Sequence, residues 1–182
     1  MNAKMNGGHL DRDRDARGRA RNARPRDALG RPLPRGAEGE PGVPDDLTLP
    51  PAEALDLAQR LIDTGRPFGA HEVLEASWKS APPDERELWQ GLAQIAVGLT
   101  HAQRGNARGA AALLRRGAGR LAGHPRGGQV TAAGPHGIDV PGVAATAQAL
   151  ADRIERDGTA AVPPGDLRPR LSVRYSSGST PG

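Results

Sequence analysis

Apolar and polar positions in the middle of the chain repeat with the period of an α-helix, in five segments separated by glycine and proline. In residues 49–65, Leu55, Ala58 and Ile62 recur at helical spacing on one broad apolar side. The other helical segments are residues 66–80, 84–105, 106–123 and 139–158. No segment shows the strict alternation of a β-strand. The pattern therefore predicts an all-α fold, a compact antiparallel bundle of about five helices.

The residues between these segments indicate where each helix begins and ends. Prolines open the first two helices and glycines close several of them, as at Gly65 and Gly105. Asn106 stands at the start of the fourth segment, where its side chain is predicted to act as an N-cap. The short connections predict that consecutive helices run antiparallel.

The third helix is predicted to be central, because it is apolar over much of its circumference. One tight apolar line runs along it, formed by Leu88, Leu92, Ile95 and Leu99. A second line beside it has small residues at Gly91, Gly98 and Ala102. Small residues on this face predict that another helix approaches closely.

The two ends of the chain have a different composition. Residues 1–47 alternate charges of both signs and contain few large apolar residues, which predicts a disordered extension; a nucleic-acid-binding arm is the alternative. Residues 48–162 form the predicted bundle domain. Residues 163–182 are predicted to be a flexible tail, in which Leu171 and Val173 are candidates to dock on the bundle.

The net charge of +4 does not by itself indicate an anionic partner. Residues 48–157 carry twelve charges of each sign, so the surplus lies in the ends. Within the bundle, however, residues 88–138 contain six arginines and no acid. Four of these arginines lie on the fourth helix, and they either bind nucleic acid or an acidic partner, or form a solvated face that pairs with the first helix of the same or another subunit. The lack of interleaved aromatic residues favours the second interpretation.

Several classes of protein are disfavoured by what the sequence lacks. There is no cysteine, and therefore no disulfide framework or thiolate chemistry. No apolar run is long enough to span a bilayer, and the first residues do not resemble a secretory signal. We therefore expect a soluble, cytoplasmic protein without a membrane partner.

The stretch AHEVLEASW, residues 70–78, places a histidine and a carboxylate on an apolar helix face. His71 and Glu75 are one turn apart, so their side chains can touch. One interpretation is a functional pair that shares a metal or in which Glu75 orients His71 as a base. The zinc motif H-E-x-x-H would need a second histidine at position 75. The other interpretation is a buried polar pair with Arg86 or a glutamine of the third helix as further partner.

A second group of polar residues recurs on the third helix. Gln90, Gln94 and His101 share one line, nearly opposite the line of leucines. Periodicity alone favours a solvated face; the alternative is that the second helix covers it and brings His71 and Glu75 to Gln94 and His101. Outside the helices, His124 and His136 lie in a glycine-rich loop and are expected to be solvated.

Residues 68–117, FGAHEVLEASWKSAPPDERELWQGLAQIAVGLTHAQRGNARGAAALLRRG, resemble the bacterial domain-of-unknown-function family numbered 309. The positions that carry the resemblance are Phe68, His71, Glu72, Glu75, Trp78, Glu85, Arg86, Gln90, Gly91, Gln94, Ala96, His101, Gly105, Asn106, Gly109, Ala110, Leu113 and Leu114. The resemblance extends into the last helix and is looser over the first. It implies a compact helical fold and no particular reaction. It also favours the covered interpretation of the polar line on the third helix.

We therefore predict a non-catalytic module that binds a protein or a small ligand through a polar centre. The predicted polar centre consists of His71, Glu72, Glu75, Arg86, Gln90, Gln94 and His101. Two alternatives stay open: a metal-assisted hydrolase using His71 and Glu75, and a nucleic-acid-associated protein using the arginines of the fourth helix. The sequence identifies neither a cofactor nor a partner; another protein and a second copy of the chain are the candidate partners, and nucleic acid is a disfavoured alternative.

Overall fold

The computed structural model describes residues 24–44, 47–124 and 134–172. Five α-helices form the domain: α1 (Pro51–Asp63), α2 (Pro67–Ser80), α3 (Arg86–Gln103), α4 (Ala107–Ala122) and α5 (Val140–Asp157). Three short 3₁₀ helices follow α4: η1 (Pro135–Gly137), η2 (Thr159–Ala161) and η3 (Pro164–Leu167). The described residues contain no β-strand beyond isolated bridges, so the all-α prediction is confirmed. The disorder predicted for residues 1–23 and 173–182 lies outside the described residues.

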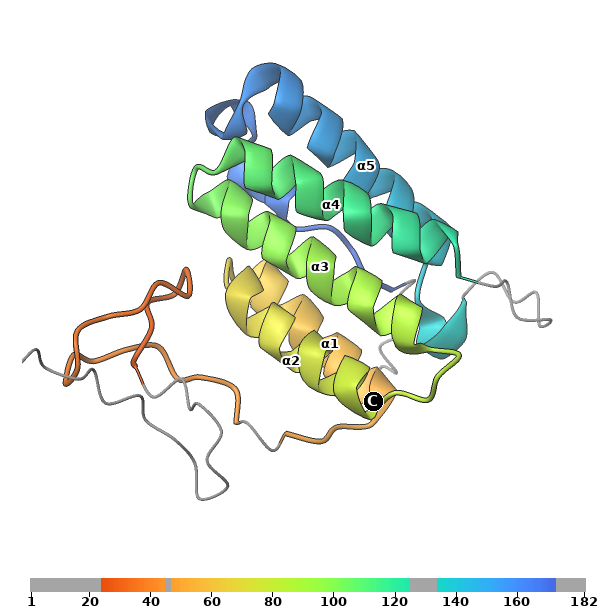
Figure 1. The fold of residues 1–182 in the computed structure, drawn as a ribbon, viewed down its shortest axis with the longest axis horizontal. Coiled ribbons are helices and arrows are strands. Elements are labelled where there is room, and N and C mark those ends of the chain that lie inside the picture. The colour runs from red at the N-terminus through yellow and green to blue at the C-terminus, as the bar shows by residue number, and fades with distance from the viewer. Residues whose placement is uncertain (1–23, 45–46, 125–133, 173–182) are drawn as a thin grey trace, which may run out of the picture.

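Each helix packs against the next one along the chain. Figure 1 shows α3 between α2 and α4, with α1 beside α2 and α5 beside α4. The central position predicted for α3 is therefore confirmed, since α3 contacts both of its neighbours. α3 therefore lies between α2 and α4. Its polar residues Gln90, Gln94 and His101 are half-buried.

Local sequence fixes the ends of the helices. Asn106 precedes α4, and its side-chain oxygen accepts a hydrogen bond from the Gly109 backbone N–H, as predicted. Asp139 caps α5 in the same way through Gly142. These caps satisfy backbone donors that the first turn of a helix leaves without partners.

The core is built from small and branched aliphatic side chains, with Trp89 as its largest member. Both predicted lines of α3 are buried. A β-carbon added to Gly117 of α4 would lie 2.7 Å from the backbone oxygen of Gly91 and 2.7 Å from Cγ1 of Ile95. The two helices therefore approach each other as closely as the small-residue line predicts.

Of the predicted N-terminal extension, residues 24–44 lie beside the ends of the helices (Figure 1, orange and red). Residues 26–33 form a tight turn, which we call the N-terminal turn. Arg26 and Pro32 pair as an antiparallel bridge, and the Asp27 carboxylate accepts hydrogen bonds from the backbone N–H groups of Leu29 and Arg31. This segment folds locally without forming a helix.

The described part of the predicted C-terminal tail packs into the domain. The Leu171 side chain is 1% exposed, so its predicted docking is confirmed; Val173 lies outside the described residues. The buried side chain of Gln59 in α1 holds the Leu171 backbone, and Ser172 pairs with Ile138 as an isolated bridge. The sequence predicted a boundary between the bundle domain and the C-terminal tail after residue 162. The described part of that tail packs against the domain.

Among the described residues, every helix is too short or too polar to cross a membrane.

Candidate functional site

His71 lies in the first half of α2, half-buried beside Phe68. The centroids of the two rings are 6.0 Å apart, and 23% of the His71 side chain is exposed. Its Nε2 is 3.6 Å from a carboxylate oxygen of Glu75, which is longer than a hydrogen bond. Its Nδ1 is shielded and has no hydrogen-bond partner among the described residues. The predicted i,i+4 pair therefore exists, but as a loose contact.

Burial lowers the pKa of His71 below its ordinary value, since removal from water disfavours the charged ring. The Glu75 carboxylate acts in the opposite direction, and the ammonium group of Lys79 adds to the lowering. His71 is therefore neutral at physiological pH. A neutral imidazole can donate one hydrogen bond and accept another.

The two carboxylates of α2 have separate partners. Glu75 forms an ion pair with Lys79 at 3.0 Å, and Glu72 accepts a hydrogen bond of 3.5 Å from the Val43 backbone N–H. Arg86 was a candidate partner of the His71–Glu75 pair. It donates instead to the backbone carbonyl of Ala81. Glu72 therefore contacts the N-terminal segment, and Glu75 stays within its own helix.

Gln94 of α3 contacts α4, which the sequence did not indicate. The Gln94 oxygen accepts a hydrogen bond from Nε of Arg120 at 3.2 Å, and the same guanidinium forms an ion pair with Glu87. Gln90, one turn earlier, is half-buried. Gln94 is therefore part of a polar link between α3 and α4. A meeting of Gln94 with His71 stays a prediction.

The N-cap beside His101 determines which nitrogen of its neutral ring carries the proton. Asn106 uses its side-chain oxygen to accept from Gly109, so its amide NH₂ is the group that lies 2.8 Å from Nδ1 of His101. Nδ1 must then accept, and the proton of the neutral ring is on Nε2. Burial and the neighbouring Arg104 cation both lower the pKa of His101, which agrees with a neutral ring.

The N-terminal turn contacts the helices next to both histidines. A β-carbon on Gly30 would lie 2.3 Å from the Phe68 ring, and the Arg26 guanidinium is 5.1 Å from the centroid of that ring. Arg104 donates to the Leu29 carbonyl through Nε, at 2.8 Å, and also through Nη2. One turn thus reaches the neighbour of His71 on α2 and the neighbour of His101 on α3. We call Phe68, His71, His101 and Arg104 the histidine surface.

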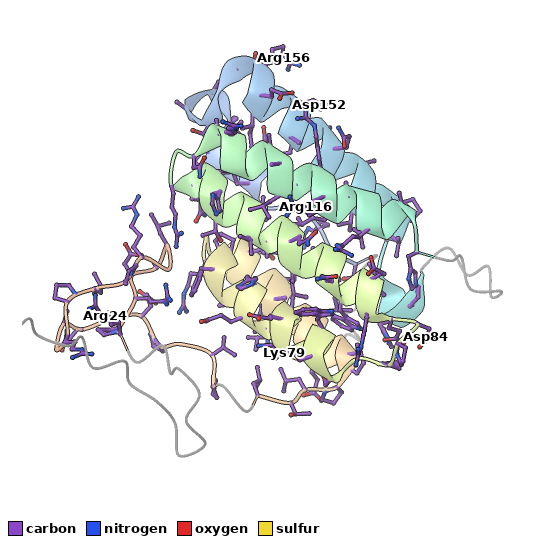
Figure 2. The ribbon with its side chains drawn as sticks, in the orientation of Figure 1. Arg24, Lys79, Asp84, Arg116, Asp152 and Arg156 are labelled. Atoms are coloured by element: carbon purple, nitrogen blue, oxygen red, sulfur yellow. The ribbon has the colours of Figure 1, made fainter. Side chains whose placement is uncertain are left out.

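Two of the arginines on α4 already have acidic partners. Arg115 contacts Asp152 at 2.7 Å and Glu155 at 2.5 Å, both on α5, and Arg120 pairs with Glu87. Figure 2 shows Arg116 on α4 and Asp152 on the adjacent α5. Arg115 therefore pairs with α5 and Arg120 with α3, whereas pairing of this face with the first helix of the same or another subunit stays a prediction. The pairing neutralises part of the positive face that the nucleic-acid alternative requires.

A polar cluster that the sequence did not indicate joins η1 to the start of α3. His136 lies 2.9 Å from the Glu85 carboxylate, which also accepts from the Trp89 indole at 3.1 Å. The backbone of His136 has φ 56°, which is uncommon for residues other than glycine. Hydrogen bonds from His136 and Trp89 lower the pKa of Glu85 against the opposing effect of burial. The i,i+4 spacing of Glu85 and Trp89 was the only signal in the sequence.

The described residues provide few ligands for a metal. Within them, no group of three histidine, aspartate, glutamate or cysteine side chains is placed to hold an ion. His71 and Glu75 supply two donors, whereas catalytic zinc sites use three protein ligands. A narrow surface depression lies elsewhere, between α2 and the segment containing Leu47 and Leu49, and none of the seven predicted residues lines it.

Comparison with known proteins agrees with the resemblance seen in the sequence. Residues 55–113 match the family model described as Domain of unknown function (DUF309). The uncharacterized protein YpuF of Bacillus subtilis (strain 168) is 46% identical over 48 residues, which are 26% of this chain and 28% of that protein. The chain therefore aligns with little more than a quarter of YpuF. No solved structure matches the chain significantly.

The family match begins within α1 and ends within α4. It thus includes the first helix, which the sequence motifs matched only loosely, and all seven residues of the predicted polar centre. The resemblance expected in the last helix lies beyond it. Residues 55–113 are therefore similar to DUF309, a domain whose function is unknown.

Proposed function

We propose that this chain is a non-catalytic protein-binding module, and that it recognises its partner through the histidine surface. The single observation that carries the proposal is the contact of Arg104 with the Leu29 carbonyl. A surface on the helices there holds a non-helical peptide segment by its backbone. The same chemistry suits a segment of another protein.

The residues around this contact support peptide recognition. Phe68 offers a half-buried aromatic ring, and Arg66 lies beside it with a guanidinium that contacts Glu40 and the Pro41 carbonyl. Glu72 accepts from a backbone N–H. Aromatic and arginine side chains are the residue types that contribute most in protein interfaces. The neutral rings of His71 and His101 add hydrogen-bond donors and acceptors that carry no charge.

The two alternative functions have less support. A metal-assisted hydrolase needs a third protein ligand next to His71 and Glu75, and the described residues offer none. A nucleic-acid-binding face needs arginines that are free to contact phosphates, and Arg115 and Arg120 are paired with acids.

The proposal is tested by comparing what variants of the full chain capture from a bacterial lysate. Phe68→Ala removes the ring of the histidine surface. Arg116→Ala removes an exposed arginine of α4 and serves as the control. We expect wild type and Arg116→Ala to retain a protein that Phe68→Ala retains roughly tenfold less, as expected for the loss of a central aromatic contact.

The captured protein is then purified and titrated against the three chains by calorimetry. Saturable binding to wild type and to Arg116→Ala, weakened in Phe68→Ala, supports the proposal. Equal capture by all three chains contradicts it, as does equal loss in the two variants. Circular dichroism of each variant confirms that the comparison is between folded proteins.

A further inference from the structure

We propose that the N-terminal turn is an exchangeable cover of the histidine surface, held in place by the chain itself and displaced when a protein partner binds. This inference rests on the proposed function, because it states how the binding surface is regulated. It is carried by two features of residues 24–43: the turn is folded by its own hydrogen bonds, and several of its described contacts with the helices are polar and partly exposed.

The turn keeps its shape through bonds that do not involve the helices. The Asp27 carboxylate accepts from the N–H groups of Leu29 and Arg31, and Nη1 of Arg26 donates to the Gly30 carbonyl at 2.7 Å. The Glu40 N–H donates to the Arg26 carbonyl at 2.8 Å, which closes the longer loop. These bonds survive undocking, so the turn can leave and return without refolding.

The described contacts between the turn and the helices involve Gly30, Leu29 and Arg26, whose guanidinium lies 5.1 Å from the Phe68 ring centroid. Gly30 is buried and packs on the face of the Phe68 ring, where any side chain would collide with it. The Leu29 carbonyl fits between two N–H groups of Arg104. A turn with glycine at its tip and an exposed carbonyl beside it is therefore the shape that this surface accepts.

The remaining contacts are polar and partly exposed. The ion pair of Arg66 with Glu40 has both side chains about a third or more exposed, at 32% and 43%. Such exposed pairs contribute little. Between residues 24 and 44, only Val43 packs against the hydrophobic core, and it does so partly. A partner that offers Phe68 and Arg104 equivalent contacts can therefore compete with the turn.

The charges of the turn act on Arg104 in both directions. Burial contributes most to the lowered pKa of Arg104; among the charges of the turn, Asp27 has the largest effect and raises that pKa, whereas Arg31 and Arg26 lower it. The turn thus brings two like charges and one opposite charge to Arg104. A partner segment with an acid and without the arginines would bind the same guanidinium more favourably.

The test uses the full chain with alanine at one of two glycines. Gly30 and Gly36 both have left-handed backbone conformations, with φ of 72° and 86°. A β-carbon at Gly30 collides with Phe68, whereas one at Gly36 meets no atom within 4 Å. Gly30→Ala therefore undocks the turn, and Gly36→Ala reproduces the backbone strain with the turn still docked.

The first readout is the rate at which trypsin cleaves the bond after Arg26, followed by mass spectrometry. Cleavage requires the turn to leave the Phe68 ring, so we expect it to be roughly tenfold faster in Gly30→Ala than in wild type and Gly36→Ala. Arg104→Gln, which removes the donors of the Leu29 carbonyl and leaves the turn itself intact, is expected to increase the rate as well. Arg108→Gln, at an exposed position of α4, is its control.

The second readout is binding of a fluorescein-labelled peptide of residues 24–43, measured by anisotropy. Gly30→Ala exposes the surface and is expected to bind the peptide, whereas wild type and Gly36→Ala, in which the surface is covered, are expected to bind it at least tenfold more weakly. Equal cleavage in the two glycine variants overturns the inference, as does a failure of Gly30→Ala to bind the peptide. Neither readout uses the captured partner, so the inference and the proposed function can fail separately.

Discussion

The two non-helical segments that flank the bundle have similar compositions and different attachments. Residues 24–44 and 163–172 are both rich in proline and arginine. The C-terminal segment inserts Leu171 into the core and bonds its backbone to the buried Gln59. The N-terminal segment rests on the half-buried Phe68 ring and on polar contacts at the surface. Burial of Leu171 makes one segment part of the domain, whereas most described contacts of the other lie at the surface.

The difference follows from how each kind of contact contributes to stability. A fully buried leucine stabilises by roughly 1.5–3 kcal/mol relative to an exposed one. An exposed ion pair contributes about 0–1 kcal/mol. How firmly a flanking segment is attached therefore depends on whether a large aliphatic side chain is fully buried in the core.

The largest effect is expected when the buried anchor of the C-terminal segment is truncated. Leu171→Ala leaves a cavity among core side chains and should lower the free energy of unfolding by about 2–5 kcal/mol. The measurement is urea denaturation followed by circular dichroism.

Leu29→Ala makes the same chemical change in the N-terminal turn. Leu29 is half-buried, and its contact with Arg104 uses the backbone carbonyl, which the substitution keeps. We expect a loss below about 1 kcal/mol, in the range of surface substitutions. Equal losses in the two variants would show that the two segments are attached alike.

The next effect concerns the polar anchor of the C-terminal segment. Gln59 is 3% exposed, and its amide bonds the Leu171 N–H at 2.8 Å and the Pro169 carbonyl at 3.2 Å. Gln59→Leu keeps the volume but leaves both backbone groups without partners. We expect a loss of about 1–3 kcal/mol in the same denaturation experiment.

The control is Gln148→Leu on α5, where the exposed amide bonds only Asp152. This variant should unfold within about 0.5 kcal/mol of wild type. A Gln59→Leu protein as stable as this control would mean that the bonds between α1 and the C-terminal segment contribute nothing.

The helices were predictable because their signals are local. The period of apolar positions, the prolines at helix starts and Asn106 as a cap all act within a few residues. The close packing of α3 on α4 followed from the line of Gly91 and Gly98, since small residues on a buried helix face permit close approach.

The contacts of the flanking segments were less predictable because they are long-range and use backbone atoms. Leu171 was recognisable as a docking candidate, since it is a large apolar residue in a polar tail. Nothing in the sequence indicated that Arg104 would bind the Leu29 carbonyl, 75 residues away. In the candidate site, the His71–Glu75 contact followed from i,i+4 spacing, whereas the partners of Gln94 and His101 depended on how α4 is placed.

A third, smaller effect is the pH dependence of the free energy of unfolding. It is expected to depend on a residue beneath the N-terminal segment and not on one beneath the C-terminal segment. His71 has a lowered pKa, so below its ordinary value of 6.5 the unfolded chain binds a proton that the folded chain does not. The stabilisation is complete above pH 6.5 and is lost as the pH falls through the lower folded pKa. We expect the free energy of unfolding to fall between pH 6.5 and 5, by at most about 1.4 kcal/mol per pH unit for each such histidine.

His71→Gln should make this dependence flatter, and the part that persists belongs to His101, whose pKa is also lowered. Gln59→Leu should keep the slope of wild type, because an amide does not titrate in this range. Denaturation midpoints at several pH values provide the measurement. An unchanged slope in His71→Gln would show that the ring takes up its proton equally in both states.

The smallest effect is expected at the ion pair between Arg66 and Glu40, where the N-terminal segment reaches the start of α2. The two groups are 3.0 Å apart and partly exposed. A double-mutant cycle with Arg66→Gln and Glu40→Gln should give a coupling energy of about 0.2–1 kcal/mol, which decreases as salt is added. A coupling energy above about 2 kcal/mol that does not change with salt would show that water is excluded from this ion pair. The N-terminal segment would then be as firmly attached as the segment that contains Leu171.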